Sequence, residues 1–323
     1  MKPILIGLAL ALLAGAAGMR VALAQGDFPA KPVRIVVAFP AGGSNDMVAR
    51  LLGQKISENI HQPVVVDNRP GAAGMIGTDF VVKSAPDGYT IMIISDSLVV
   101  NPLLNPNIKF DVRQSLAPVT LLANMTYVLL VNPAVAARDL GELVKLAKSR
   151  PGKLNYSSTG IGSTGQILME SFNRAAGVDI MHVPYKGGNT ATLAVFTNDA
   201  QVSVISVATS LPFAKAGKIR VLALLGSARD KALPEIPTLS ELGYSEFRTP
   251  WLGIFAPART SPPILQRLRN EFLKAMNMPD TREKLESQGF ELVGSTPTDF
   301  TKFIEDNVVF YEKLIREAGL KAE

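Results

Sequence analysis

The sequence predicts an α/β protein built as two similar lobes with largely parallel sheets. Short apolar segments typical of strands alternate with helical patterns along most of the chain, and this alternation indicates successive βα units. The strand, turn and helix that begin at Val33 recur loosely at Leu154. Because no low-complexity stretch or flexible linker separates the two units, we expect two lobes joined by crossing strands.

Residues 1–24 have the pattern of a secretory signal peptide. Lys2 supplies a positive charge, an apolar core follows, and Ala22 and Ala24 form a small-x-small cleavage site. A membrane anchor is the alternative, but it needs roughly 20 apolar residues and Arg20 ends this run. The sequence therefore predicts export, cleavage after Ala24 and a periplasmic location.

The expected strands are short apolar runs bounded by turn residues. They cover residues 33–39, 64–68, 90–94, 154–157, 180–183, 201–206 and 221–225. Towards the C-terminus, Ser261-Pro262-Pro263 and Ser295-Thr296-Pro297 are helix start signals, because proline fits the first helical turn. Apolar residues at helical spacing follow both signals, so two amphipathic helices are expected to pack onto a sheet.

Two glycine-rich turns are the most informative local feature. FPAGGSND at residues 39–46 and SSTGIGSTG at residues 157–165 each follow a predicted strand and open a predicted helix. A helix N-terminus offers free N–H groups and the positive end of the helix dipole, so two such ends facing one ligand suit a small carboxylate. Neither turn has the Gly-Lys-Ser/Thr ending of a P-loop or the GxGxxG spacing of a dinucleotide site.

Capping residues indicate where both helices start. Ser44 or Asn45 is a possible N-cap of the first helix. Ser163 and Gln166 form a capping-box pattern at the second. A ligand-binding first turn would leave the N–H groups around Gly43 unpaired, whereas a purely structural turn would have them capped.

Composition excludes several classes of function. Cysteine is absent, which excludes disulfides, thiol catalysis and a lipid-anchored cysteine at the cleavage site. The formal net charge of +5 is mildly basic, but Lys and Arg are scattered singly among acids, so nucleic-acid binding is not expected. The chain has 2 histidines, far apart, and no metal-ligand spacing, so neither a metal nor a cofactor is predicted.

An ordered set of motifs extends from about Phe28 to the C-terminus. These are KPVRIVVAFPAGGSNDMVAR, QPVVVDNRPGAAGMIGTDFVVKSAPDGYT, HVPYKGG, AGKIRVLAL, PTLSELGY and WLGIFAPARTSP. In this order they resemble the Bug-type extracytoplasmic solute-binding receptors of tripartite tricarboxylate transporters. The resemblance implies a type II periplasmic-binding-protein fold with the ligand cleft between the lobes.

On this resemblance the first lobe is discontinuous. It comprises residues 25–122 plus 246–323, and the second lobe comprises residues 123–245. Hinge crossings are expected near residues 122–126 and 247–252.

The resemblance also implies that the two glycine turns hold a ligand carboxylate, partly through ordered water. The residues concerned are Phe39, Ala41, Gly42, Gly43 and Asp46 in the first turn and Ser158, Thr159, Gly160, Ser163 and Thr164 in the second. Further candidates for the cleft are Ser95, Ser97, Lys186, Gly187 and Ser206.

Several candidates have an ordinary structural alternative. Asp46 would repel an anion, so it either supplies a favourable charge to the first helical turn or orients a water or backbone group at the ligand. Ser95 and Ser97 either reach the cleft or form a polar turn at a strand end. Lys186 either neutralises a second ligand carboxylate or is a solvated loop lysine. His182 is expected to be structural.

The chain departs from the family pattern after the strand at 201–206. Residues 201–212 lack the acid that the family often has there, and Ser206 is among the few polar residues in its place. A buried ammonium group without a carboxylate partner is costly, so we expect a ligand without a free amino group. Asp96 or Asp199 could supply the missing acid from elsewhere.

The sequence thus predicts a periplasmic solute-binding protein that passes a small carboxylate to membrane permease subunits. The ligand would be a dicarboxylate, a tricarboxylate or an aromatic acid, and the receptor is expected to be a monomer. One alternative is a ligand-sensing receptor that signals to a membrane sensor kinase. A secreted enzyme is the other alternative, but GxSxG is absent and the histidines support no triad.

Overall fold

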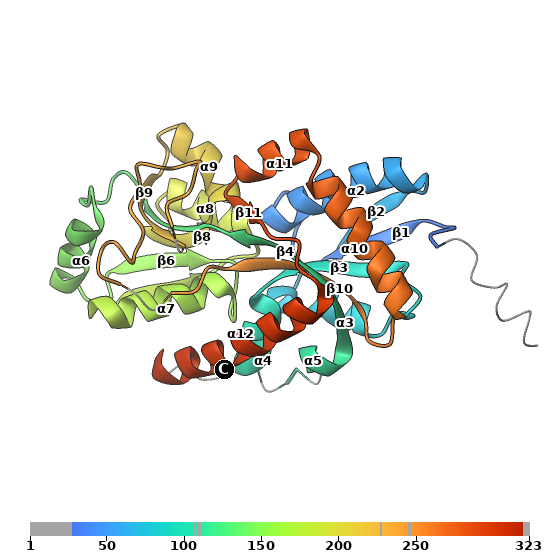
Figure 1. Ribbon diagram of the computed structural model, residues 1–323. Coiled ribbons are helices and arrows are strands. Elements are labelled where there is room, and N and C mark those ends of the chain that lie inside the picture. Colours follow the sequence, from blue (N-terminus) through green and yellow to red (C-terminus); the bar gives the residue numbers. More distant parts are fainter. Residues whose placement is uncertain (1–27, 106, 109–110, 227, 245–246, 319–323) are drawn as a thin grey trace, which may run out of the picture.

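The computed structural model describes residues 28–105, 107–108, 111–226, 228–244 and 247–318. They form two lobes, each with a central sheet flanked by helices (Figure 1), so the predicted two-lobed α/β fold is confirmed. The predicted signal peptide, residues 1–24, lies outside the described residues. Within the described part of the chain, no helix combines the length and apolar character needed to cross a membrane.

The sheet of the first lobe has the strand order β11-β4-β10-β3-β1-β2. β1 pairs in parallel with β2 and β3, whereas β10 runs antiparallel to β3 and β4, and β11 antiparallel to β4. The strands are β1 (Val33–Val37), β2 (Val64–Asn68), β3 (Thr90–Ser95), β4 (Leu116–Met125), β10 (Trp251–Pro257) and β11 (Phe290–Leu292).

The sheet of the second lobe has the order β7-β6-β8-β5-β9. β6 is parallel to β7 and β8, and β5 is antiparallel to β8 and β9. The strands are β5 (Tyr127–Val131), β6 (Leu154–Ser158), β7 (Ile180–Pro184), β8 (Val202–Ser206) and β9 (Arg220–Leu225). Both sheets are therefore mixed, and the expectation of largely parallel sheets was wrong, because strands that cross between the lobes pair antiparallel with their neighbours.

Helices cover both faces of each sheet (Figure 1). In the first lobe they are α2 (Ser44–Ile60), η1 (Ala72–Gly74), α3 (Met75–Val82), α4 (Ser97–Leu104), α5 (Val112–Ser115), α10 (Pro262–Met276), α11 (Pro279–Glu286) and α12 (Pro297–Ala318). In the second lobe they are α6 (Leu140–Ser149), α7 (Thr164–Ala176), α8 (Gly188–Phe196) and α9 (Val207–Lys215). The two predicted C-terminal helices are confirmed as α10 and α12.

Side-chain alternation in β1 explains why both faces of the first sheet are covered. Ile35 and Val37 lie in one apolar cluster with Leu52 of α2. Val36 lies in another, with Phe300 of α12. Successive strand residues point to opposite faces, so a strand that is apolar throughout must be packed on both sides. This double packing holds the strand ends rigid beneath the turns that follow them.

The chain passes from the first sheet to the second at Thr126, between β4 and β5. Thr126 donates its N–H to the Gly289 carbonyl and accepts from the Val207 N–H, so both lobes hold it. The chain returns between β9 and β10. Residues 123–125 belong to β4 of the first sheet, whereas the predicted boundary assigned them to the second lobe. We therefore propose that the first boundary between the lobes lies at Thr126.

Candidate functional site

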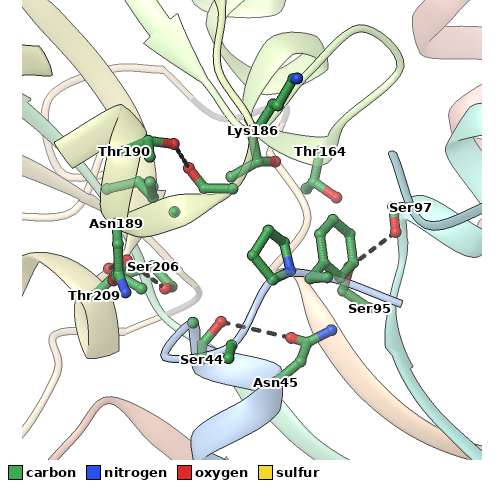
Figure 2. A pocket seen from close by; sticks show the side chains of 18 of the residues that line it. Ser44, Asn45, Ser95, Ser97, Thr164, Lys186, Asn189, Thr190, Ser206 and Thr209 are labelled. Carbon is green, nitrogen blue, oxygen red and sulfur yellow. Dashed lines mark hydrogen bonds between the residues drawn. The ribbon is translucent and has the colours of Figure 1, made fainter. Parts of the chain in front are cut away.

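A cavity of about 130 Å³ lies between the lobes, where the parallel strands of both sheets end (Figure 2). Ligands of open α/β sheets bind at this position. The first lobe contributes Phe39, Pro40, Ala41, Gly43, Ser44, Asn45, Ser95 and Ser97. The second contributes Tyr127, Thr159, Thr164, Lys186, Gly187, Gly188, Asn189, Thr190, Ile205, Ser206 and Thr209.

Helix N-termini converge on this cavity. The helices α2, α4, α7, α8 and α9 each place a residue of their first turn or cap on its wall. Each end carries a partial positive charge, and several of them together create a site that favours an anion. Among the described residues that line the wall there is neither Asp nor Glu.

The sequence-predicted residues fall into two groups. Those on the wall are Phe39, Ala41, Gly43, Ser95, Ser97, Thr159, Thr164, Lys186, Gly187 and Ser206. The others, which do not line it, are Gly42, Asp46, Ser158, Gly160 and Ser163. The roles of all these residues in binding stay predictions.

Several wall residues were missed by the sequence analysis. Ser44 and Asn45 were interpreted only as possible caps. Residues 188–190 form the start of α8. This helix follows a strand and begins at the pair Gly187-Gly188, so the sequence shows the same order of strand, glycines and helix as in the two turns that were recognised. Tyr127 belongs to an antiparallel strand that was not predicted.

Asp46 holds the first glycine turn together and does not face the cavity. One carboxylate oxygen accepts from the Gly42 N–H and from Arg50 Nε, both at 2.9 Å, and the other accepts from Asn68 Nδ2 at 2.9 Å. Burial alone would raise the pKa of Asp46, but these hydrogen bonds and the Arg50 charge together lower it. The carboxylate therefore orients a backbone group.

The N-terminus of α2 is open. Its cap is Gly43, without a side-chain hydrogen bond to the first turn, so neither of the possible caps, Ser44 and Asn45, closes this helix end. Gly43 itself lies on the cavity wall. An uncapped helix end beside a cavity is the arrangement expected for a ligand-binding turn.

The second glycine turn is closed by its own side chains. Ser163 Oγ accepts from the Gln166 N–H at 3.4 Å, as the capping pattern predicted, and Gln166 Oε1 accepts from the Gly162 N–H at 2.7 Å. Ser158 Oγ exchanges hydrogen bonds with both backbone groups of Gly160. Only Thr159 and Thr164 of the predicted residues in this turn reach the wall.

Ser158 and His182 form a pair that was not foreseen, with 2.6 Å between Oγ and Nε2. Ser158 is fully buried, and which of the two atoms donates depends on the tautomer of His182. Burial lowers the pKa of His182 to about 4, which keeps the imidazole neutral, and its ring stacks on Tyr156. Neither Ser158 nor His182 lines the cavity wall, and the structural role of His182 stays a prediction.

Asp96 is fully buried at the junction of the lobes. Its carboxylate accepts from Thr164 Oγ1 of the second lobe at 2.5 Å and from the Tyr311 hydroxyl of α12 at 2.6 Å. Burial raises the pKa of Asp96 to about 6, although both hydrogen bonds act to lower it. Neither Asp96 nor Asp199 is on the cavity wall, so neither supplies an acid there. In the described part of the chain no acidic and histidine residues cluster as metal ligands.

The lobes also touch at the mouth of the cavity. Asn189 Nδ2 donates to the Gly42 carbonyl at 3.0 Å, and Asn101 Nδ2 donates to the Ile161 carbonyl at 3.4 Å. Gly187 has a φ of 103° and lies so near Pro40 that an added Cβ would be 3.1 Å from its ring. These contacts describe a closed cleft. Lys186 is exposed, and its side chain points away from the labelled polar groups (Figure 2).

Comparison with known proteins identifies the family. The sequence model of the family described as "Tripartite tricarboxylate transporter family receptor" matches residues 48–320. The chain belongs to this receptor family. Protein BugT of Bordetella pertussis is 35% identical over 308 residues, which cover 94% of both chains. The resemblance inferred from the ordered motifs is thereby confirmed.

Solved structures of similar proteins show the same fold. Periplasmic binding protein BugD has a TM-score of 0.87 at 26% identity, covering 92% of this chain and all of its own. An R. palustris protein solved with adipate has a TM-score of 0.88 at 31% identity, covering 91% and 99%. MatC from Rhodopseudomonas palustris, with bound malate, has a TM-score of 0.84 at 27% identity, covering 89% and 100%. This tripartite tricarboxylate receptor family is one of periplasmic solute-binding proteins.

Proposed function

We propose that the protein binds a small organic carboxylate in the periplasm and delivers it to the membrane permease subunits of a tripartite tricarboxylate transporter. The observation that carries this proposal is the convergence of helix N-termini on a cavity whose described wall holds no Asp or Glu. Such a wall stabilises an anion and disfavours a cation.

The ligand class follows from the size and chemistry of the cavity. Its volume of about 130 Å³ is several times the space that one water needs, so a small acid fits. Phe39, Pro40 and Ile205 add apolar surface between the polar groups. We propose a dicarboxylate, a tricarboxylate or an aromatic acid without an amino group, because an ammonium group would lie there without a carboxylate partner. The adipate and malate in two neighbouring structures support this class.

The closed cleft is the form that a permease would recognise, since a ligand that binds both walls stabilises closure. A receptor for a sensor kinase would use the same closure and is the second candidate function. Catalysis is not proposed, because Ser158 and His182 do not line the cavity and the described residues of its wall include no Asp, Glu, His or Cys. Export with cleavage after Ala24, action as a monomer and the absence of nucleic-acid binding complete the proposal.

A thermal unfolding screen of the periplasmic protein tests the ligand class. Malate, adipate, citrate and benzoate would be compared with aspartate. An acid at about 100 times its Kd should stabilise the protein by about 2.7 kcal/mol. Stabilisation by aspartate alone, or by none of the acids, would contradict the proposal.

Two further measurements test location and partner. The intact mass of the periplasmic protein should correspond to a chain that begins at Gln25. Uptake of the bound acid by cells that express the permease should require the receptor. Ligand binding without any effect on uptake would favour the sensor role instead.

A further inference from the structure

Asn45 carries a buried hydrogen-bond donor that no other group satisfies. Its side chain is only 5% exposed, and its Nδ2 is without a hydrogen-bond partner among the residues that the structure describes. Buried polar groups are nearly always paired, and an unpaired donor is costly. An acceptor from outside the described residues, a water or a ligand, would remove this cost.

The position of Asn45 shows where that acceptor would lie. Asn45 is in the first turn of α2, which Gly43 caps without a side-chain hydrogen bond, and it lines the cavity. Its Oδ1 accepts from Ser44 Oγ, another wall residue, at 3.5 Å, and its Nδ2 is the end without a partner among the described residues (Figure 2). The unpaired Nδ2 and the open helix end therefore belong to one site.

We infer that the Asn45 amide binds the ligand carboxylate at the N-terminus of α2 and selects a carboxylate over a carboxamide. This inference rests on the proposed function and adds to it a specificity-determining side chain. The backbone N–H groups of the turn and Asn45 Nδ2 are all hydrogen-bond donors. A carboxylate has only acceptor oxygens, so both of its oxygens can pair with such donors. The NH₂ of a carboxamide would face them without a partner.

The nearby acid does not weaken this selection. Asp46 is the next residue, but Gly42, Arg50 and Asn68 occupy its carboxylate oxygens from the side away from the cavity. Its charge therefore fixes the turn and is neutralised in part by Arg50. Ser44 and Asn45 are the residues of this turn that bring a polar side chain to the wall, and Asn45 Nδ2 is the atom of the two side chains that is buried without a partner among the described residues.

The substitution Asn45→Asp tests the inference, because it keeps the shape and replaces the donor by a carboxylate. Calorimetry would compare succinate with its monoamide succinamate, and adipate with adipic acid monoamide. Loss of a hydrogen bond to a charged group corresponds to about a 10- to 100-fold weaker Kd. We expect at least this loss for the diacids and a smaller loss for the monoamides, so that the preference shifts towards the amide.

The matched control is Asn59→Asp on the same helix. Asn59 Nδ2 is also buried without a partner among the described residues, but Asn59 lies in the last turn of α2, roughly 20 Å away along the axis. This variant should bind every probe as the parent does. The unliganded melting temperature of Asn45→Asp should be unchanged or raised, because an acid in the first turn favours the helix. Asn45→Ala should weaken the diacids about tenfold with little effect on folding.

The outcomes separate this inference from the proposed function. If the parent binds a diacid and both Asn45 variants bind it equally well, the inference is overturned and the proposed function stands. If the Asn45 variants bind the diacid more weakly but Asn59→Asp loses as much affinity, the inference is also overturned. If the parent binds none of the acids, the proposed function is wrong, and the inference that rests on it is wrong as well.

Discussion

The first glycine turn, residues 39–46, and the second, residues 157–165, have the same pattern in the sequence but end differently in the structure. In the first, Gly43 caps α2 without a side-chain hydrogen bond, and the nearest acid, Asp46, supports the turn from behind. In the second, Ser163 and Gln166 close the end of α7 with their own side chains. Similar glycine patterns therefore produced one open helix end and one capped end.

This difference changes how the two lobes share a ligand. The second lobe presents open helix ends as well, those of α8 and α9, whose caps Gly187 and Ser206 make no side-chain hydrogen bond to the N–H groups of the first turn. Gly187 lies against Pro40, and Asn189 bonds to the Gly42 carbonyl, so α2 and α8 meet at the mouth of the cavity. The ligand carboxylate is thus expected nearer to α2 and α8 than to α7.

The largest expected effect concerns the two aspartates beside these turns. Asp46 has a lowered pKa and Asp96 a raised one, to about 6 from 3.8. A carboxyl whose pKa is raised by folding stabilises the fold below its unfolded pKa and loses that contribution as pH rises through the folded pKa. Between pH 4 and pH 7.5 the parent should therefore lose on the order of 3 kcal/mol of its free energy of unfolding through Asp96, and the Asp96→Asn variant should not lose this contribution. The free energy of unfolding of the variant minus that of the parent should rise accordingly. Denaturant titrations across this range measure it, and a difference independent of pH would contradict it.

The second prediction concerns the open helix end. Gly43 has a φ of −79°, and an added Cβ would lie 3.6 Å from the Pro40 carbonyl, so a side chain fits without backbone strain. Gly43→Val should nevertheless weaken acid binding at least about tenfold, because its methyl groups fill the space at the N–H groups. Gly43→Ala is the milder control. Calorimetry with unliganded melting temperatures checks this, and unchanged affinity would place the ligand elsewhere.

The smallest effect is expected at the capped end. Ser163→Ala removes the α7 cap and should lower the free energy of unfolding by about 1 kcal/mol. Its effect on affinity should stay within about twofold, or about 0.4 kcal/mol of binding free energy, since Ser163 is not on the wall. A loss of affinity as large as that of Gly43→Val would show that both turns hold the carboxylate equally.

Much of the fold could be predicted because the relevant signals are local. Strand 64–68 has the predicted bounds, and α10 and α12 begin at the expected prolines. The Ser163 and Gln166 cap is also a contact between near neighbours in the chain. The antiparallel strands β4, β5, β10 and β11 were not predicted individually, because their pairing joins distant segments and follows no βα alternation.

Within the site, the sequence by itself determined that glycine turns open helices at strand ends and that residues 201–212 lack an acid. The tertiary structure alone decided which helix end stays open and what each acid does. Asp46 turns from the ligand because Asn68 holds it from the neighbouring strand, and Asp96 is buried against Tyr311, 215 residues away. Caps and turns depend on groups a few residues apart, whereas burial, pKa and an unpaired donor such as Asn45 Nδ2 depend on everything packed around a group.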